Sequence, residues 1–176
     1  ADVLNRVNSR LAADLAPHRF VTAVLVYLGS DGEIDLASAG HAPILIAPSA
    51  DSPIQELPAT GLPLVVDPDP SVEDLPPVRL ERGGQLVLLS DGIFEAMSRR
   101  GELIGIDRVQ ATLRSQSDAP AERQIAHLRD AVRTWSGGDA LTDDQTIVIA
   151  RRARQAVCRV GVEPVDPVRP VIGTLV

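Results

Sequence analysis

Apolar residues recur at two spacings along this chain, and each spacing predicts a different kind of element. Near the start they lie three or four positions apart among polar residues, which predicts an amphipathic helix that ends no later than Pro17. The same spacing returns before Ser115 and again from about Ala119, so two consecutive helices are expected there. The apolar residues of the first helix are Val3, Leu4, Val7, Leu11 and Leu15.

Shorter apolar runs predict strands, and most of them precede the two later helices. Residues 20–28 are rich in β-branched and aromatic side chains, and a glycine-containing turn leads into the alternating pattern of residues 34–38. Residues 44–46 predict a third strand, so we expect an antiparallel meander in the first half of the chain. Residues 48–78 hold most of the prolines and predict a long surface segment, followed by a short pairing segment that ends at Leu80.

The most apolar strand is predicted at residues 86–89, after the turn pair Gly83-Gly84, and it ends at Ser90-Asp91-Gly92. Its uninterrupted apolar residues are typical of a strand buried on both faces. A carboxylate at the end of such a strand costs free energy unless a cation meets it, and a hard metal ion is the first candidate. The glycine that follows the carboxylate allows the backbone to turn sharply.

A second pair of carboxylates precedes the last predicted strand. Asp143 and Asp144 come directly before the strand predicted at residues 145–150, whose residues 147–150 are apolar. If this strand and the one before Ser90 are antiparallel neighbours, Asp91 and Asp143 lie at the same edge of a sheet, where carboxylate oxygens suit Mg²⁺ or Mn²⁺. The alternative is that each aspartate only caps a turn, because aspartate favours turns and helix starts.

Ser38 and His41 form another arrangement of reactive side chains, because a hydroxyl and a base three residues apart could serve a hydrolase. No nucleophile-elbow sequence surrounds Ser38, and His41 stands in a turn before Pro43. We therefore expect His41 to hydrogen-bond this turn or to flank the metal-binding edge.

The composition narrows the classes of function. The net charge of -7, from 17 basic and 24 acidic residues, argues against nucleic acid binding, which needs a basic face. The chain has no lysine, so lysine-based catalysis is excluded. The single Cys158 favours a reducing, cytoplasmic location, and no apolar run approaches the roughly 18 residues of a membrane span. Because Ala1 falls inside a helical pattern, we expect the chain to be a piece of a longer protein.

Six short segments, in chain order, carry a resemblance to a known family. They are Phe20-Val21-Thr22-Ala23, Ala39-Gly40-His41-Ala42-Pro43, Gly61-x-Pro63-Leu64, Ser90-Asp91-Gly92-Ile93-x-Glu95-Ala96, Gly105 at the start of a helix, and Asp143-Asp144-Gln145-Thr146. Together they resemble the stage II sporulation protein E branch of the metal-dependent, protein phosphatase 2C-like (PPM-type) serine/threonine phosphatases.

The resemblance implies both a fold and a domain boundary. Residues 1–152 match the C-terminal part of the phosphatase domain, which leaves residues 153–176 as a tail, either a linker or an added edge strand. The implied fold is α+β: two antiparallel β-sheets pack as a sandwich and are flanked by helices, with the N-terminal strands of the domain missing from this chain. The implied site lies at one edge of the sandwich.

The resemblance also implies the chemistry. In this family two Mn²⁺ or Mg²⁺ ions activate a water that attacks the phosphorus of phosphoserine or phosphothreonine, so no side chain acts as the nucleophile. Asp91 and Asp143 would be metal ligands. Four further residues would surround these ligands and hold their orientation: Ser90, Gly92, Asp144 and His41.

The expected partner is a phosphoprotein, in this branch often a phosphorylated anti-sigma-factor antagonist, and a homodimer is left open. The family's N-terminal strands carry a Gly-Asp motif, whose aspartate bridges both metals, and an Asp-x-x-Gly-His-Gly motif. The first strands of this chain carry neither, so we expect the chain to be the C-terminal part of a longer enzyme. The alternative is a non-catalytic phosphatase-like domain that acts as a protein-interaction module.

Overall fold

The computed structural model describes residues 1–16, 18–67, 69, 72–138, 143–153 and 159–165. The chain divides into two compact units. The first unit contains Ala1–Ile44 and Glu56–Leu80, and the second contains Leu45–Gln55 and Glu81–Val176.

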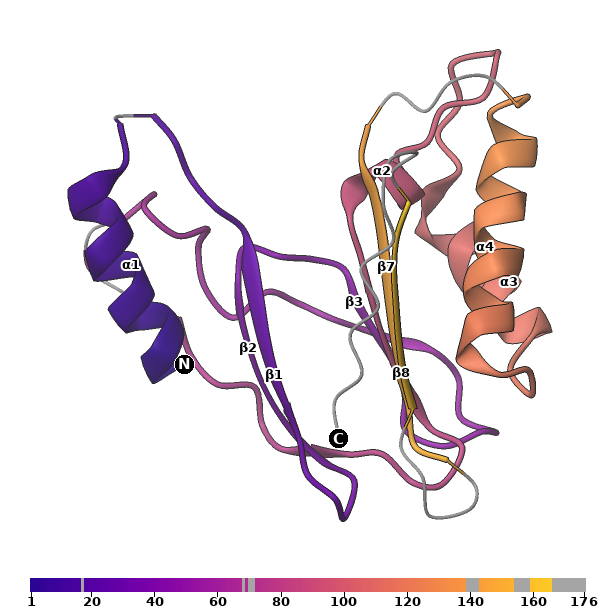
Figure 1. Cartoon of the computed structure of the whole chain (residues 1–176), viewed down its shortest axis with the longest axis horizontal. Helices are drawn as coiled ribbons and strands as arrows, with labels where there is room; N and C mark the ends of the chain where they lie inside the picture. Colours follow the sequence, from indigo (N-terminus) through magenta and orange to yellow (C-terminus); the bar gives the residue numbers. More distant parts are fainter. Residues whose placement is uncertain (17, 68, 70–71, 139–142, 154–158, 166–176) are drawn as a thin grey trace. The chain divides into compact units, whose positions relative to one another are not determined.

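The first unit combines the predicted N-terminal helix with a small antiparallel sheet (Figure 1). Helix α1 spans Asp2–Asp14, and strands β1 (Ala23–Leu28) and β2 (Glu33–Ala39) form the predicted hairpin. Strand β5 (Val78–Arg79) pairs with β2, which gives the sheet order β1-β2-β5. The helix, the hairpin and the pairing of residues 78–79 are therefore confirmed.

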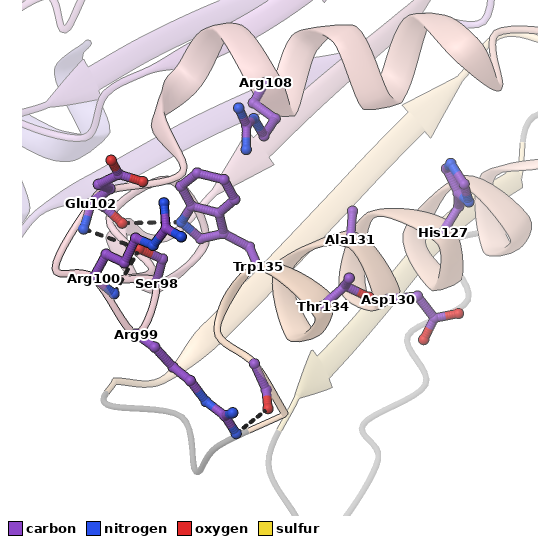
Figure 2. Close-up of a pocket in the computed structure, with 11 residues that line it drawn as sticks. Ser98, Arg99, Arg100, Glu102, Arg108, His127, Asp130, Ala131, Thr134 and Trp135 are labelled. Carbon is purple, nitrogen blue, oxygen red and sulfur yellow. Dashed lines mark hydrogen bonds between the residues drawn. The ribbon is translucent and has the colours of Figure 1, made fainter.

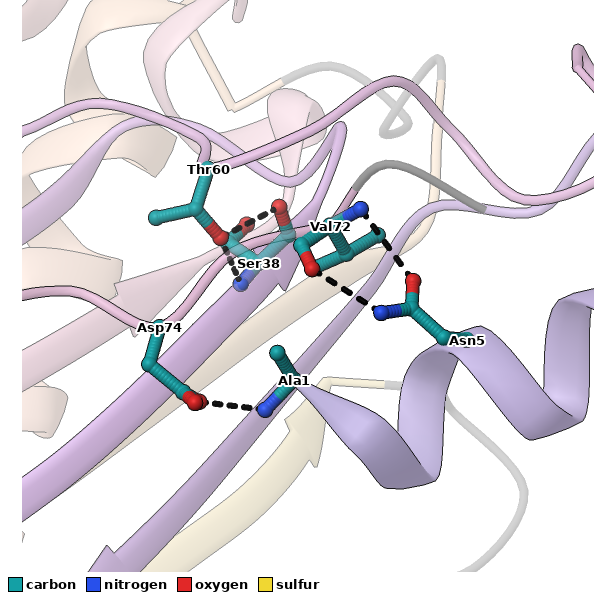
Figure 3. A network of polar contacts seen from close by, with 6 residues as sticks. All are labelled: Ala1, Asn5, Ser38, Thr60, Val72 and Asp74. Carbon is teal, nitrogen blue, oxygen red and sulfur yellow. Dashed lines mark hydrogen bonds and ion pairs between the residues drawn. The ribbon is translucent and has the colours of Figure 1, made fainter. Parts of the chain in front are cut away.

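Part of the segment 48–78, which was predicted to lie on the surface, belongs instead to the core. Leu64 and Val72 are buried with Leu4 of α1 in one hydrophobic cluster. The side chain of Asn5 holds this segment by two hydrogen bonds: its Nδ2 donates to the carbonyl of Val72 (3.0 Å), and its Oδ1 accepts from the Val72 N–H (3.1 Å), as Figure 3 shows. Buried polar groups paired in this way fix the loop against the helix.

The second unit is built on a five-stranded antiparallel sheet with the order β4-β3-β6-β7-β8. Its strands are β3 (Ile44–Ala47), β4 (Gln55–Leu57), β6 (Gln85–Leu89), β7 (Gln145–Arg151) and β8 (Arg159–Val165). The predicted meander is wrong at its third strand, because β3 joins this sheet and not the β1-β2-β5 sheet. β8 pairs along the whole of β7, so it is the added edge strand that the sequence left open, while the boundary at residue 152 stays a prediction.

Three helices complete the second unit. Helices α3 (Gly105–Ser115) and α4 (Ala121–Trp135) match the two predicted helices and cover one face of the sheet (Figure 1). Helix α2 (Asp91–Phe94) has only four residues. It ends early because the carbonyl of Ala96 accepts the Ile104 N–H (2.9 Å), which draws residues 96–104 into a hairpin-like loop.

The core of the second unit lies between the sheet and these helices. Its fully buried residues come from β3 and β6, from β7, and from α3 and α4, and they include Leu45, Val87, Leu89, Leu113, Ile125, Leu128, Val132, Ile147 and Ile149. The longest described helix, α4, has 15 residues, and no helix in the described part of the chain combines the length and apolar character of a membrane span. The predicted α+β fold with two antiparallel sheets and flanking helices is thus confirmed.

Replacement of Leu128 by alanine tests this core. The side chain is 0% exposed on α4, so its removal leaves a cavity against the sheet and should lower the free energy of unfolding of the second unit by about 2–5 kcal/mol. Urea unfolding followed by the fluorescence of Trp135, the single tryptophan, measures the loss. The exposed Arg133→Ala on the same helix is the control and should change stability by no more than about 0.5 kcal/mol. Equal losses in both variants would contradict the assigned core.

Candidate functional site

The candidate site lies where β6 ends and β7 begins. The two strands are antiparallel neighbours, and Leu89 at the end of β6 faces Ile147. The pairing continues for one more residue, because the N–H of Ser90 donates to the carbonyl of Thr146 (3.0 Å). Asp91, after β6, and Asp143, before β7, therefore lie at the same edge of the sheet. This juxtaposition was predicted from the sequence and is confirmed.

The hydroxyl of Ser90 ties the two chain segments together at this edge. Its Oγ donates to the carbonyl of Asp144 (3.0 Å) and accepts the N–H of Thr146 (2.8 Å). Ser90 stands at the N-cap position of α2, yet its side chain makes no capping hydrogen bond there. It bonds instead to the facing strand, so the hydroxyl holds the backbone on which Asp143 and Asp144 stand.

Gly92 lies against the same backbone. A Cβ at this position would stand 2.4 Å from the carbonyl oxygen of Asp144 and 3.4 Å from the Cβ of Asp143. The Nε2 of Gln145, a residue only 3% exposed, donates to the carbonyl of Gly92 (3.0 Å). Glycine is therefore required by a close approach of two chain segments.

Gln145 was not among the residues expected to shape the site. The sequence offered two weak signals: a polar residue that opens an apolar strand, and its place in the Asp143-Asp144-Gln145-Thr146 segment of the family resemblance. Its buried amide and the absence of a side chain at Gly92 together determine how closely the β6 and β7 ends approach.

Both candidate metal ligands are exposed carboxylates with one oxygen already oriented. An oxygen of Asp91 (Oδ1) accepts the N–H of Gly92 (3.0 Å), and the Oδ1 of Asp143 accepts the N–H of Asp144 (2.8 Å). Each bond is to the N–H of the next residue, so it orients the carboxylate, and the interpretation that each aspartate only caps a turn stays a prediction. Within the described residues neither carboxylate forms a salt bridge, so the second oxygen of each remains available to a ligand.

The two carboxylates are the kind of ligand that a hard divalent cation prefers, but two ligands are too few to complete its coordination. Carboxylate oxygens are the ligands that Mg²⁺ and Mn²⁺ prefer, and Asp91 with Asp143 would supply two of the roughly six positions that Mg²⁺ requires. The described ranges contain no group of three or more histidine, cysteine, aspartate or glutamate side chains that could hold a metal ion. Water or other residues would have to complete the coordination.

Ser38 and His41 lie in the first unit, whereas both carboxylates lie in the second. The Oγ of Ser38, which is fully buried, donates to the backbone carbonyl of His41 (2.6 Å). This bond commits the hydroxyl to the turn and argues against a nucleophilic role for it. The predicted place of His41 beside the metal ligands stays a prediction.

Two of the segments that carry the family resemblance contact one another in the first unit. Gly40 has a φ of +67°, and a Cβ there would stand 2.4 Å from the Cγ of Pro63. The N–H of Gly40 also donates to the carbonyl of Gly61 (2.9 Å). The glycine and the proline of these separate motifs therefore fit against each other, which explains why they occur together.

Comparison with known sequences places the chain in a family. The family model of stage II sporulation protein E (SpoIIE) matches residues 1–153. Among curated proteins, phosphoserine phosphatase RsbU of Bacillus subtilis (strain 168) is 26% identical over 153 residues, which make up 86% of this chain and 45% of RsbU. The chain therefore spans about half the length of this relative.

Solved structures show the same fold. The SiaA-PP2C domain of Pseudomonas aeruginosa matches with a TM-score of 0.72 and 20% identity, over 86% of this chain and 59% of that one. The Mn-presoaked phosphatase domain of SpoIIE from Bacillus subtilis matches with a TM-score of 0.65 and 19% identity, over 88% and 67%. The RsbU and RsbW domains of Rv1364c from Mycobacterium tuberculosis match with a TM-score of 0.62 and 22% identity, over 83% and 40%. The chain belongs to the stage II sporulation protein E family, in the PPM-type phosphatase branch, and has its fold.

Proposed function

We propose that the complete protein is a metal-dependent phosphatase that hydrolyses phosphoserine or phosphothreonine on a regulatory protein. The observation that carries this proposal is the position of Asp91 and Asp143 at the adjoining ends of β6 and β7. Family membership and the phosphoserine phosphatase RsbU among the relatives support the reaction class. The proposal covers the complete protein, because this chain spans only part of its relative.

The two carboxylates explain why a cation is needed. Asp91 and Asp143 are both exposed, and without a cation they would repel a phosphate group by like-charge interaction. In the proposed site two Mn²⁺ or Mg²⁺ ions would, when bound, activate water and neutralise charge on the phosphate. The protein's own contribution is geometric: the Gly92 and Asp144 N–H groups orient the ligand oxygens, and Ser90 holds the Asp144 backbone in place.

The substrate that we propose is a phosphorylated anti-sigma-factor antagonist in the bacterial cytoplasm. The resemblance to the stage II sporulation protein E branch supports this class of substrate. So does the presence of RsbU and RsbW domains together in Rv1364c, which has a similar fold over 40% of its chain. The cytoplasmic location and a homodimer stay predictions.

Asp91→Asn and Asp143→Asn test the metal ligands. Each removes a charged donor, so in the complete protein each should lower Mn²⁺-dependent hydrolysis of a phosphoserine peptide by at least about 100-fold, since even residues that only orient ligands cost 10–100-fold. Manganese binding, followed by electron paramagnetic resonance, should weaken in parallel. Asp107→Asn, on the exposed first turn of α3, is the matched control and should leave both unchanged.

Full activity in the Asp91→Asn variant would refute the assignment of that ligand. If the complete protein binds a phosphoprotein but shows no turnover with Mn²⁺, the non-catalytic interaction module is the correct alternative.

Gly92→Ala tests the close approach of the two strand ends. The new Cβ would collide with the Asp144 carbonyl, so the variant should be destabilised by about 1–3 kcal/mol and should bind Mn²⁺ more weakly, because the Asp143 backbone must shift. Thermal unfolding and Mn²⁺ titration measure the two effects. Gly101→Ala separates collision from backbone strain: its φ is +78°, but a Cβ there meets nothing within 4 Å. That variant should keep its Mn²⁺ affinity, and an equal loss of affinity in both would overturn the explanation.

A further inference from the structure

A cavity of about 670 Å³ lies in the second unit beside the C-terminal end of α4 (Figure 2). Its walls come from the loop that follows α2, from the first turns of α3 and from one face of α4. None of the residues proposed to hold the metal lines it, and the proposed reaction does not use it. The cavity is therefore a separate feature from the site at the strand ends.

One end of the cavity is lined by Arg100, Arg108 and the single carboxylate of Glu102, so positive charge is in excess there. The guanidinium of Arg108 lies 3.9 Å from the centre of the Trp135 ring, and the indole N–H of Trp135 donates to the carbonyl of Glu102 (3.1 Å). Arg100 reaches toward the same ring, as Figure 2 shows. Within the described ranges neither Arg100 nor Arg108 forms a salt bridge with a carboxylate.

The loop that carries Arg100 is itself fixed by neighbouring contacts. The Nη2 of Arg99 donates to the carbonyl of Gly137 (2.9 Å), which ties the loop to the end of α4. The hydroxyl of Ser98 accepts the N–H groups of Arg100 (3.3 Å) and Glu102 (3.2 Å). These contacts hold the backbone that carries Arg100, so less backbone entropy is lost when its side chain binds an anion.

The shape of the cavity favours an extended segment of polypeptide. The α4 residues that line it begin at His127 and end at Trp135 and recur every three or four positions, so they form one face of the helix over about 12 Å. An extended chain of about four residues has this length. Asp130 stands at the end away from Arg100 and Arg108 (Figure 2), so these two cationic side chains are concentrated at one end of the groove.

The cavity lies at the same end of the sheet as the candidate metal ligands. Figure 1 shows the C-terminal end of α4, the start of β7 and helix α2 together at this end of the second unit. Asp91 begins α2, and the loop with Ser98 and Arg100 follows it. A polypeptide in the cavity would therefore continue toward the strand ends at which we place the phosphoserine.

We propose that this cavity is a docking subsite for an acidic segment of the phosphoprotein substrate, with carboxylates of the segment held by Arg100 and Arg108. The inference rests on the proposed function, because it takes the substrate of that reaction as the occupant. Arginine suits this role, since its planar guanidinium pairs with a carboxylate through two parallel hydrogen bonds. The two arginines favour acidic residues in the bound segment. The length of the groove favours a segment in an extended conformation.

The experiment measures binding to the 176-residue chain, with no metal and no turnover. The probes are a short peptide rich in aspartate and a counterpart in which every aspartate is asparagine. Because Trp135 is the single tryptophan and lines the cavity, its fluorescence should change when the aspartate peptide binds. We expect the aspartate peptide to bind roughly tenfold more tightly than the asparagine peptide, and we expect this preference to shrink at high salt.

The variants identify the site. Arg100→Gln combined with Arg108→Gln should abolish the preference for aspartate, measured by calorimetry because the loss of Arg108 alters the emission of Trp135 directly. Arg123→Gln, an exposed arginine at the other end of α4, is the matched control and should keep the preference. Circular dichroism of each variant establishes that it is folded.

Several outcomes would overturn the inference. One is equal binding of the two peptides, and another is a preference that survives in the double variant. A third is binding of ATP at Trp135 without binding of the aspartate peptide, which would indicate a nucleotide site. Failure of the complete protein to hydrolyse phosphoserine peptides, with the aspartate preference retained, would refute the proposed function and leave the acidic-peptide subsite standing.

Discussion

The candidate site depends on the register of β6 against β7. Side chains alternate between the two faces of a sheet, so a slip of one residue would turn the buried side chains of these strands to the wrong face. In β7 Ile147 and Ile149 are inaccessible to solvent while Thr146 is exposed, and this alternation fixes the register against β6. The same register places Asp91 and Asp143 at one edge. The hydrophobic core thus determines the geometry of two polar residues that lie outside it.

At that edge Ser90 and Gly92 have roles that differ from the ones expected from their sequence positions. A serine before a short helix is expected to cap it, but the Ser90 hydroxyl bonds to Asp144 and Thr146 on the facing segment. A glycine after an aspartate is expected to serve a turn, but Gly92 is needed because the Asp144 carbonyl occupies the space of a side chain. Both residues bring the two carboxylate-bearing segments together.

The sequence predicts what local pattern determines and misses what distant contacts determine. The helices and most strands were predicted because their periodicity is contained within each segment. The partner of β3 was not, since residues 44–47 are buried throughout and a fully apolar run does not indicate which sheet it joins. The anchoring of the 56–80 segment was also missed, because it depends on Asn5 and Asn8 of α1 bonding to residues more than fifty positions away.

The candidate site, too, could be predicted from the sequence only where local pattern determines it. Asp91 and Asp143 could be paired from the sequence because each stands at the end of an apolar strand, and adjacent antiparallel strands bring such ends together. Gln145 could not be identified, because its role depends on the carbonyl of Gly92 across the strand pair. His41 lies in the other compact unit, so local pattern carries no information on its distance from the carboxylates.

The net charge of the chain sets a constraint on any phosphoprotein phosphatase of this kind. With a net charge of -7, this chain would repel a phosphorylated, acidic partner at long range. At physiological salt such long-range repulsion is screened beyond about 8 Å, so local cations decide whether the partner binds. In the second unit, ions held by Asp91 and Asp143 would attract the phosphate, and Arg100 and Arg108 would attract carboxylates. In the proposed function, recognition of a phosphoprotein would therefore depend on positive charge at these two places in the second unit.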